Sequence, residues 1–221
     1  MSVVVTIDGP GGAGKGTISR IVAMRMGWHY LDSGALYRTL ALAALKAGVD
    51  ETQSEQLLDL AKHLPLTFLL ESEDEDHRVL LDGVDVTDDL RNEQTGSMAS
   101  KVASNQAVRA ALLQWQRDNA VAPGLVADGR DMGTVVFPDA PIKIYLTASL
   151  EERANRRYKQ LIAKGLDVSI GELLEEIRVR DERDMNREVA PLKPADDAVT
   201  IDSTEITIAQ VVDNILKLIN K

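Results

Sequence analysis

Residues 9–17 read Gly9-Pro10-Gly11-Gly12-Ala13-Gly14-Lys15-Gly16-Thr17, and they directly follow a short apolar run at residues 3–7. The segment after them has helical spacing, so the order predicts a strand, a phosphate-binding loop and a helix. The glycines let backbone N–H groups turn toward an anion, the helix adds the positive end of its dipole, and Lys15 adds a full positive charge. A nucleoside triphosphate such as ATP is the ligand that this arrangement fits.

The loop departs from the commonest form of this motif at one position. Gly16 follows the lysine where a Ser or Thr usually stands, and Thr17 comes one residue later. The order Gly-Lys-Gly-Thr is typical of small nucleotide kinases. The simpler interpretation is a glycine-rich turn that binds nothing, but the full match between a strand and a helix favours ATP binding.

Composition predicts one α/β domain over residues 1–221. The chain is 44% hydrophobic and 27% charged, which is enough to bury a core and argues against disorder. It has no cysteine, and its three histidines lack ligand spacing, so no protein metal site is expected. No signal peptide or membrane-spanning stretch is visible, and we expect a cytoplasmic protein.

The chain is acidic overall, but one segment is rich in arginine. The formal net charge is −10, which argues against binding of nucleic acid or of a membrane surface. Seven arginines nevertheless lie within residues 153–187. This cluster predicts a small phosphorylated ligand held in one place, and we expect a monomer that binds small molecules only.

Strand and helix signals alternate along the chain. Strands are expected at 3–7, 28–31, 125–128, 142–146 and 198–202. Helices are expected at 17–26, from about 35 to 48, and at 50–64, 91–104, 106–121, 149–164, 169–187 and 207–219. Capping-box patterns mark helix starts at Ser149, Ser169 and Thr207. Alternation of this kind predicts a parallel sheet covered by helices on both faces.

Residues 66–90 change character. Two short strands, at 66–70 and 79–81, are separated by an acidic turn at 71–76, and Asp82-Gly83 gives another turn signal. We interpret this segment as a small β insertion.

A polar group follows one of the buried strands, in the order Asp128-Gly129-Arg130-Asp131. Ligands of open α/β sheets bind where such strands end, although a plain polar turn would have the same composition. Asp128 has the position of a Walker-B-like acidic residue and could hold Mg²⁺ through water.

Two helices carry arginines on one face. Arg180, Asp184 and Arg187 are spaced i, i+4 and i+7, while Arg153, Arg156 and Arg157 are spaced i, i+3 and i+4. A solvated helix with Arg–Asp pairs is the simpler account, and close arginines need some anion to offset their repulsion. Phosphoryl transfer between two anions needs such convergent positive charge, because the protein mostly positions and screens the phosphates.

The chain resembles the bacterial cytidylate kinases, a family that transfers the γ-phosphoryl group of ATP to CMP or dCMP. The resemblance covers nearly the whole chain and rests on TIDGPGGAGKGT, LDSGALYR, VRAALLQWQR, ADGRDMGTVVFPDAPIKIYL, SLEERANRR and RDERDMNR. Departures are minor: Gly11-Gly12 where a Ser often stands, and Met185 after Asp184. The resemblance implies a P-loop nucleoside monophosphate kinase fold with a core, a monophosphate-binding part at about 33–121 and a lid at about 149–165.

Matching positions imply roles for single residues. Those implied to line the cytosine pocket are Ser33, Ser100, Arg109, Asp131 and Arg187. Arg38 and Arg130 would hold the CMP phosphate, and Arg180 with Asp184 the ribose. The implied catalytic set is Lys15, Arg130, Arg153 and Arg157, with Mg²⁺ bound together with ATP. The last two would be lid arginines, which we expect to be exposed in the absence of nucleotide.

Cytosine chemistry agrees with such a pocket, since an amino donor at N4 needs a carboxylate while O2 and N3 need donors. The nearest alternative is the same fold acting on UMP, AMP or shikimate, but the pairing of Asp131 with Arg109 favours cytosine. A GTPase switch would need an Asn/Thr-Lys-x-Asp motif, which the sequence lacks. An ATP-dependent nucleic-acid-binding protein is disfavoured by the acidic balance.

Overall fold

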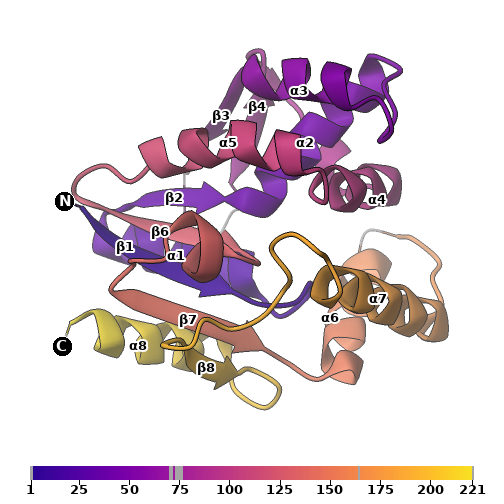
Figure 1. The fold of residues 1–221 in the computed structure, drawn as a ribbon. Coiled ribbons are helices and arrows are strands. Elements are labelled where there is room, and N and C mark those ends of the chain that lie inside the picture. Colours follow the sequence, from indigo (N-terminus) through magenta and orange to yellow (C-terminus); the bar gives the residue numbers. More distant parts are fainter. Residues whose placement is uncertain (1, 70–71, 73–76, 164, 221) are drawn as a thin grey trace.

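The computed structural model describes residues 2–69, 72, 77–163 and 165–220 (Figure 1). Five parallel strands form the main sheet: β1 (Val3–Asp8), β2 (His29–Asp32), β6 (Gly124–Gly129), β7 (Ile142–Thr147) and β8 (Val199–Asp202). Their spatial order is β2-β6-β1-β7-β8, which confirms the predicted parallel sheet. Because β1 is the central strand, the loop that follows it leaves from the middle of the sheet.

Helices follow or connect these strands. They are α1 (Lys15–Met26), α2 (Ser33–Lys46), α3 (Ser54–Lys62), α4 (Glu93–Val102), α5 (Gln106–Asp118), α6 (Leu150–Ala163), α7 (Ile170–Met185) and α8 (Ile208–Ile219). The other helical turns are a 3₁₀ turn, η1 (Asp89–Arg91), and a π-helical turn, η2 (Met132–Val136). In Figure 1, α6 and α7 lie side by side beyond the ends of the strands.

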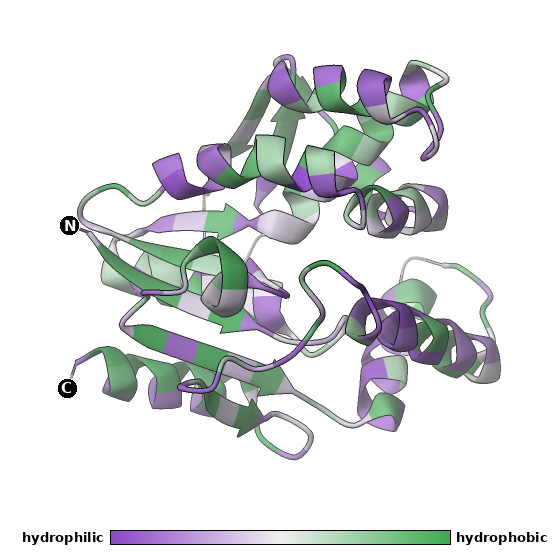
Figure 2. Cartoon of the chain, in the orientation of Figure 1, coloured by the Kyte–Doolittle hydropathy of each residue, from purple (hydrophilic) through white to green (hydrophobic). Residues whose placement is uncertain are grey.

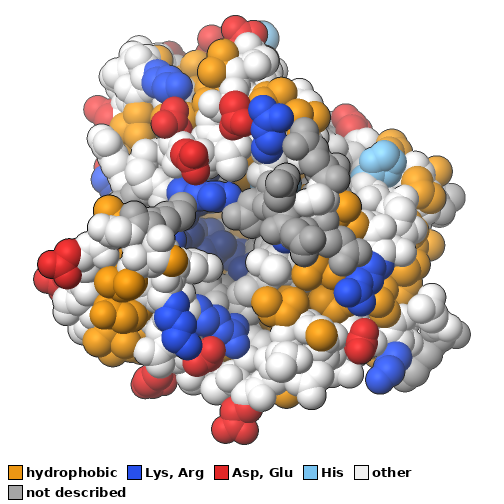
Figure 3. Space-filling model, turned by 180° about the vertical axis from the view of Figure 1, so that it is seen from behind, with side chains coloured by type: hydrophobic (Ala, Val, Ile, Leu, Met, Phe, Trp, Pro, Cys, Tyr) orange, Lys and Arg blue, Asp and Glu red, His pale blue; other side chains and the backbone are white. Residues whose placement is uncertain are grey.

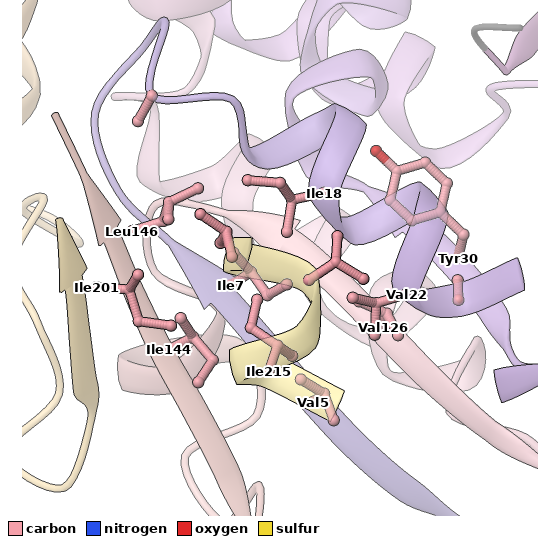
Figure 4. Close-up of a cluster of buried hydrophobic side chains, with 14 residues drawn as sticks. Val5, Ile7, Ile18, Val22, Tyr30, Val126, Ile144, Leu146, Ile201 and Ile215 are labelled. Atoms are coloured by element: carbon pink, nitrogen blue, oxygen red, sulfur yellow. The ribbon is translucent and has the colours of Figure 1, made fainter. Parts of the chain in front are cut away.

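The core of the molecule lies on both faces of the sheet, as two-sided burial of parallel strands requires. One face packs against α1 and α8 through a cluster that includes Val5, Ile7 and Ile144 (Figure 4). The other face packs against η2 through Val4 and Leu125, with side chains of α5 at its border. In Figure 2 the strands are largely hydrophobic, while α6 and α7 are largely hydrophilic. The fold therefore rests on the sheet, and α6 and α7 are free to present charged side chains.

A second helical layer packs beside the sheet. Buried side chains from α2, α3, α4 and α5 form one cluster, which contains Leu36, Leu40, Leu57, Val102 and Leu112. This layer fixes the start of α2 and the end of α4 relative to the main sheet. Both of those points carry residues that the sequence predicts to bind a ligand.

The β insertion is confirmed as a small antiparallel sheet of β3 (Leu66–Leu69), β4 (Arg78–Leu81) and β5 (Val84–Asp85). β5 was not predicted. Asp82 and Gly83 turn the chain between β4 and β5 with φ of 51° and 74°, as their turn signal indicated. The predicted acidic turn at 71–76 lies outside the described residues, apart from Ser72.

Several predicted helix ends were wrong by a few residues. α1 begins two residues earlier than expected, and α3 is shorter than 50–64. α7 ends at Met185, because the Leu192 N–H bonds to the Asp184 carbonyl at 2.9 Å and the chain turns back. Arg187 therefore lies beyond the helix, not on its face.

One of the three predicted capping boxes is complete. Thr207 and Gln210 form a full capping box on α8. The Ser149 hydroxyl accepts from the Glu152 N–H at 3.1 Å, but the Ser149 N–H donates to the Thr204 hydroxyl at 2.9 Å, so only half of the box predicted there forms. Ser169 precedes α7 but makes no side-chain cap bond, so the box predicted there was wrong. Among the helices of the described residues, none combines the length and the apolar character needed to cross a bilayer.

Candidate active site

A cleft of about 1370 Å³ lies where the phosphate loop, the first turns of α1 and α2, and the α6–α7 pair meet. Its basic lining includes Lys15, Arg38, Arg130, Arg156, Arg157 and Arg180. Figure 3 shows Lys and Arg side chains within a hollow on the face opposite to the view of Figure 1. A protein of net charge −10 thus gathers positive charge in one concave site.

The phosphate loop has the glycines that its path requires. Gly9 has φ of 151°, and a Cβ there would lie 1.9 Å from the Leu146 carbonyl oxygen, so only glycine fits. Gly14 has φ of 92° and caps α1. Residues 11–17 of the predicted loop line the cleft, whereas Gly9 and Pro10 are not among its lining residues.

Lys15 folds back over the loop. Its Nζ donates to the Pro10 carbonyl at 3.0 Å, and the side chain is buried. Burial lowers the Lys15 pKa, and the nearby Asp128 carboxylate opposes this effect. The ammonium group is thus held at the mouth of the loop with a poorly hydrated charge, which an anion in the cleft would stabilise.

Asp8 connects the end of β1 to the segment after β6. Its two carboxylate oxygens accept from the Met132 and Gly133 N–H groups, each at 2.8 Å. Burial raises the Asp8 pKa to about 6, although these two hydrogen bonds favour the charged form. Sequence reasoning missed both this contact and η2, and the only signal was the position of Asp8 directly before Gly9.

A small pocket of about 50 Å³ adjoins the cleft between α2, α4 and α5. All five residues expected around cytosine line it: Ser33, Ser100, Arg109, Asp131 and Arg187. Arg38, Arg130 and Arg180 line both the pocket and the cleft. The structure therefore brings together residues from five separate stretches of the sequence, as the resemblance implied.

Asp131 forms a buried ion pair with Arg109 inside this pocket. Burial raises the Asp131 pKa, and Arg109 opposes the rise. Tyr37, which was not predicted, also lines the pocket and lies 5.7 Å from the Arg109 guanidinium carbon. Its signal was present in the LDSGALYR stretch, next to Arg38.

Asp184 holds two arginines at once. It pairs with both Arg130 and Arg187, and although burial would raise its pKa, these arginines lower it overall. Arg187 also donates to the Ser100 hydroxyl at 3.4 Å. Asp184 is 1% exposed and lies behind the two cavities, so it fixes the guanidinium groups that line them.

Arg130 and Arg180 pack against the phosphate loop. A Cβ built on Gly11 would lie 3.5 Å from Arg130 Nη2 and 3.7 Å from Arg180 Cζ. Arg130 and then burial lower the Arg180 pKa to about 9, and Arg180 Nε has no partner within the described chain. Two cations held together in this way are stabilised by an anion between the loop and the small pocket.

Arg38 reaches the same region from α2. Its Nη1 donates to the Leu90 carbonyl at 2.6 Å, and Gly96 makes room for it, since a Cβ there would lie 3.0 Å from that nitrogen.

Arg153 corrects one expectation. It is 5% exposed, pairs with Asp181 at 2.6 Å and donates to the Gly11 and Ala148 carbonyls, each at 3.1 Å. The prediction that it is exposed was wrong, because α7 supplies a carboxylate that draws it under the loop. Arg157 is partly exposed and lines the cleft.

Arg156 also has a structural partner set. It pairs with Glu152 at 2.8 Å, and it donates to the Ala13 carbonyl at 3.3 Å and the Ser203 carbonyl at 2.5 Å. The anions that offset repulsion among the α6 arginines are therefore carboxylates of α6 and α7. Arg156 and Arg157 both line the cleft, and among the described residues Arg157 has no ion pair with a carboxylate.

A magnesium ion fits the oxygen donors beside the loop. Asp128 is buried next to Lys15, burial raises its pKa to about 7, and Thr17 lines the cleft on the same side. The Tyr30 hydroxyl is also buried there, beside the Asp128 carboxylate. Among the residues that the structure describes, no three acidic, His or Cys side chains gather into a metal cage.

Comparison with known proteins gives consistent results. The family model described as cytidylate kinase matches residues 5–221. A cytidylate kinase of Pseudomonas fluorescens (strain SBW25) is 62% identical over 213 residues, 96% of this chain and 93% of that protein. That of Colwellia psychrerythraea (strain 34H / ATCC BAA-681) is 58% identical over 217 residues, 98% of this chain and 96% of that protein.

One solved structure, an uncharacterized protein from Eubacterium ventriosum ATCC 27560, aligns over 100% of this chain and 99% of its own with a TM-score of 0.52. Its sequence identity of 12% supports a shared fold alone.

Proposed function

The chain belongs to the cytidylate kinase family, and from this premise we propose that it transfers the γ-phosphoryl group of ATP to CMP or dCMP, giving ADP and CDP or dCDP. One observation carries the proposal. Arg130 and Arg180 line both the large cleft and the small pocket, and both lie against the phosphate loop. A donor phosphate on the loop and an acceptor phosphate at the pocket would meet at these two cations.

Residues 9–17 bind the ATP phosphates in this proposal, and Lys15 follows the charge of the transferred group. Arg38 and Arg130 hold the acceptor phosphate, and Arg157 reaches the phosphates from α6. Arg153 donates to the Gly11 carbonyl and so holds the loop in place. Mg²⁺ bound with ATP neutralises part of the phosphate charge, with Asp128 and Thr17 as the residues on its side of the loop.

The small pocket reads the base. Ser33, Ser100, Arg109, Asp131 and Arg187 surround cytosine in the proposal. Asp131 accepts from the N4 amino group, and the arginines donate to O2 and N3. For the ribose the proposal names Arg180 and Asp184; Arg180 lines the pocket, and Asp184 lies behind it.

Three parts of the molecule have different tasks in this proposal. Residues 33–121 bind the monophosphate, residues 149–165 form a lid, and the rest is the core of a cytoplasmic monomer. Hydrogen exchange of residues 149–163, measured with and without a bisubstrate analogue, tests the lid, and unchanged protection would argue for a static helix. Sedimentation velocity tests the monomer.

A panel of monophosphates tests the activity itself. The purified protein is incubated with ATP, Mg²⁺ and CMP, dCMP, UMP, AMP or GMP in turn, and ADP release is followed. We expect CMP and dCMP to be the best acceptors and AMP and GMP to be poor ones. A higher kcat/KM for AMP or GMP than for CMP would refute the proposal, and preference for UMP would reassign the pocket within the same fold.

A further inference from the structure

His77 is a largely buried histidine of the β insertion that has no part in the mechanism described above. It stands directly before β4 and lines the large cleft. Its side chain is 15% exposed, whereas that of His63 is 75% exposed. An imidazole in such a place is held by specific contacts.

The His77 ring joins the small sheet to the main sheet. It meets the ring of Tyr30 in β2 edge to face, with 5.2 Å between the centroids, and the ring of Phe68 in β3 in the same way at 5.8 Å. Edge-to-face packing restricts the orientation of a ring as well as its position. The ring nitrogens of His77 are therefore presented in a fixed direction.

One of these nitrogens faces Asp32, the last residue of β2. His77 Nε2 lies 3.4 Å from Asp32 Oδ2, and the Asp32 side chain is 18% exposed. The other carboxylate oxygen, Oδ1, accepts from the Ala35 N–H at 2.8 Å and so caps α2. A single carboxylate thus links the β insertion to the first turn of α2.

Asp32 also stands beside another carboxylate. The pairing of β2 with β6 puts it next to Asp128. Burial is the main reason why the Asp128 pKa is raised, and repulsion from Asp32 adds to it. A hydrogen-bond donor next to Asp32 counteracts this repulsion and keeps the carboxylate at the helix cap.

The start of α2 carries two residues of the proposed acceptor site. Ser33 is its first residue and lines the small pocket, and Arg38 lines both cavities. The chain of the insertion also packs on this helix, because Val79 shares an apolar cluster with Ala35, and the Leu90 carbonyl accepts from Arg38 at 2.6 Å. The position of α2 therefore depends on how the insertion is held.

We propose that His77 positions the acceptor site: its Nε2–H, directed at Asp32, holds the first turn of α2 where Ser33 and Arg38 meet the monophosphate. The inference rests on the proposed function, since it concerns binding of CMP. It makes His77 a positioning residue, which acts through Asp32 without touching the substrate, and it gives the β insertion a part in acceptor binding.

Two substitutions separate the contact with Asp32 from the packing of the ring. His77→Phe retains a ring between Tyr30 and Phe68 but has no N–H to donate. His77→Gln gives up the ring but offers an amide N–H in place of the Nε2–H. If His77 served only to pack, Phe would be tolerated and Gln would not.

Calorimetry measures the binding of CMP and, separately, of a non-hydrolysable ATP analogue with Mg²⁺, and kinetics at saturating substrates give kcat. We expect His77→Phe to raise the Kd for CMP about fivefold, a typical effect of losing one hydrogen bond. The Kd for the analogue and kcat should stay within about twofold, because neither the phosphate loop nor the transferred group is touched. His77→Gln should bind CMP within about twofold of the wild type.

His63→Phe is the matched control. His63 Nδ1 also lies 3.4 Å from an aspartate oxygen, that of Asp59, but both side chains are exposed and neither lines a cavity described above. This variant should bind CMP as the wild type does.

Asp32→Ser removes the partner of His77 and keeps a cap, since a Ser hydroxyl caps a helix about as well as a carboxylate does. In this background His77→Phe should have no further effect on the Kd for CMP, because both changes remove the same contact. Any effect of Asp32→Ser itself is common to the two proteins compared.

An unchanged Kd for CMP in His77→Phe, an equal loss in His77→Gln or His63→Phe, or a loss that persists in the Asp32→Ser background would each overturn the inference. Failure of the proposed function looks different, because the wild type would then not phosphorylate CMP in the acceptor panel. An enzyme active on CMP whose Kd is unchanged in His77→Phe refutes the role of His77 alone.

Discussion

Lys15 carries its charge within the loop that receives the nucleotide, and its ammonium group is buried before any ligand binds. We expect Lys15→Ala to lower kcat about 100- to 1000-fold, the usual effect of removing one preorganised electrostatic contact. The free energy of unfolding should change far less, because the side chain bonds to a carbonyl of its own loop. Steady-state kinetics and urea unfolding of the same preparation measure both, and a variant that keeps more than a third of wild-type turnover would contradict the assignment.

Asp131 should decide between cytosine and uracil, because uracil places an acceptor at position 4 against a carboxylate oxygen that has no hydrogen to donate. Asp131→Asn can turn an amide N–H toward that acceptor, so the CMP-to-UMP ratio of kcat/KM should fall by roughly tenfold or more.

Arg109→Met provides the comparison for that variant. This variant should have a lower kcat/KM for CMP and no higher kcat/KM for UMP, since an apolar side chain gives neither base a hydrogen bond. An Asn at 131 that slows both substrates equally would mean that the carboxylate orients the neighbouring Arg130 instead of recognising the base.

Asp8 should leave a pH signature in stability. Its folded pKa of about 6 lies above the ordinary 3.8, so the folded state binds the proton more tightly and loses that advantage as pH rises. Two pKa units correspond to about 3 kcal/mol in total, of which about 1 kcal/mol falls between pH 5 and 7. Urea unfolding over this range should show a decline that is smaller in Asp8→Asn. Part of the decline in stability should remain in this variant, because burial raises the pKa of Asp128 as well. An equal decline in stability for the wild type and Asp8→Asn over this pH range would refute the raised pKa of Asp8.

At the scale of elements, α6 and α7 are joined by one buried ion pair, Arg153 with Asp181. Asp181→Ala leaves the Arg153 guanidinium buried without its carboxylate, and such a change typically costs about 3–5 kcal/mol. We expect the free energy of unfolding to fall by about that amount, measured by urea unfolding at neutral pH.

Glu175→Ala on the same helix is the control. Its ion pair with Arg178 is exposed, so stability should stay nearly unchanged. Equal effects of the two substitutions would mean that the buried pair contributes no more than a solvated one.

At the scale of the whole molecule, an acidic chain presents a basic cleft to two anionic substrates. Attraction between exposed charges is screened within about 10 Å at 0.1 M salt, so the encounter should be sensitive to ionic strength. We expect kcat/KM for CMP to fall about tenfold between 0.05 and 0.5 M NaCl at fixed Mg²⁺, mostly through KM. Sucrose at matched osmolarity should have little effect, and a salt-independent kcat/KM would argue against the cleft as the binding site.

Local patterns in the sequence were enough to predict the fold and the phosphate loop. The glycine spacing of residues 9–17, the alternation of strands with helices and the polar group after β6 each act over a few residues. Such short-range regularities determine the backbone conformation and the direction in which each side chain points. The parallel sheet and the β insertion follow from them, whereas the five residues that line the small pocket were proposed from the family resemblance alone.

Tertiary structure alone decided which charges meet. Asp8 bonds to N–H groups 124 and 125 residues away, and Arg153 turned from an expected lid side chain into a buried support because α7 brings Asp181 to it. Asp184 joins Arg130 to Arg187, and Tyr30 meets Asp128 only through the pairing of β2 with β6. Helical and strand periods say which way a side chain points on its own element. The partner it finds depends on how distant elements pack, and no local period encodes that.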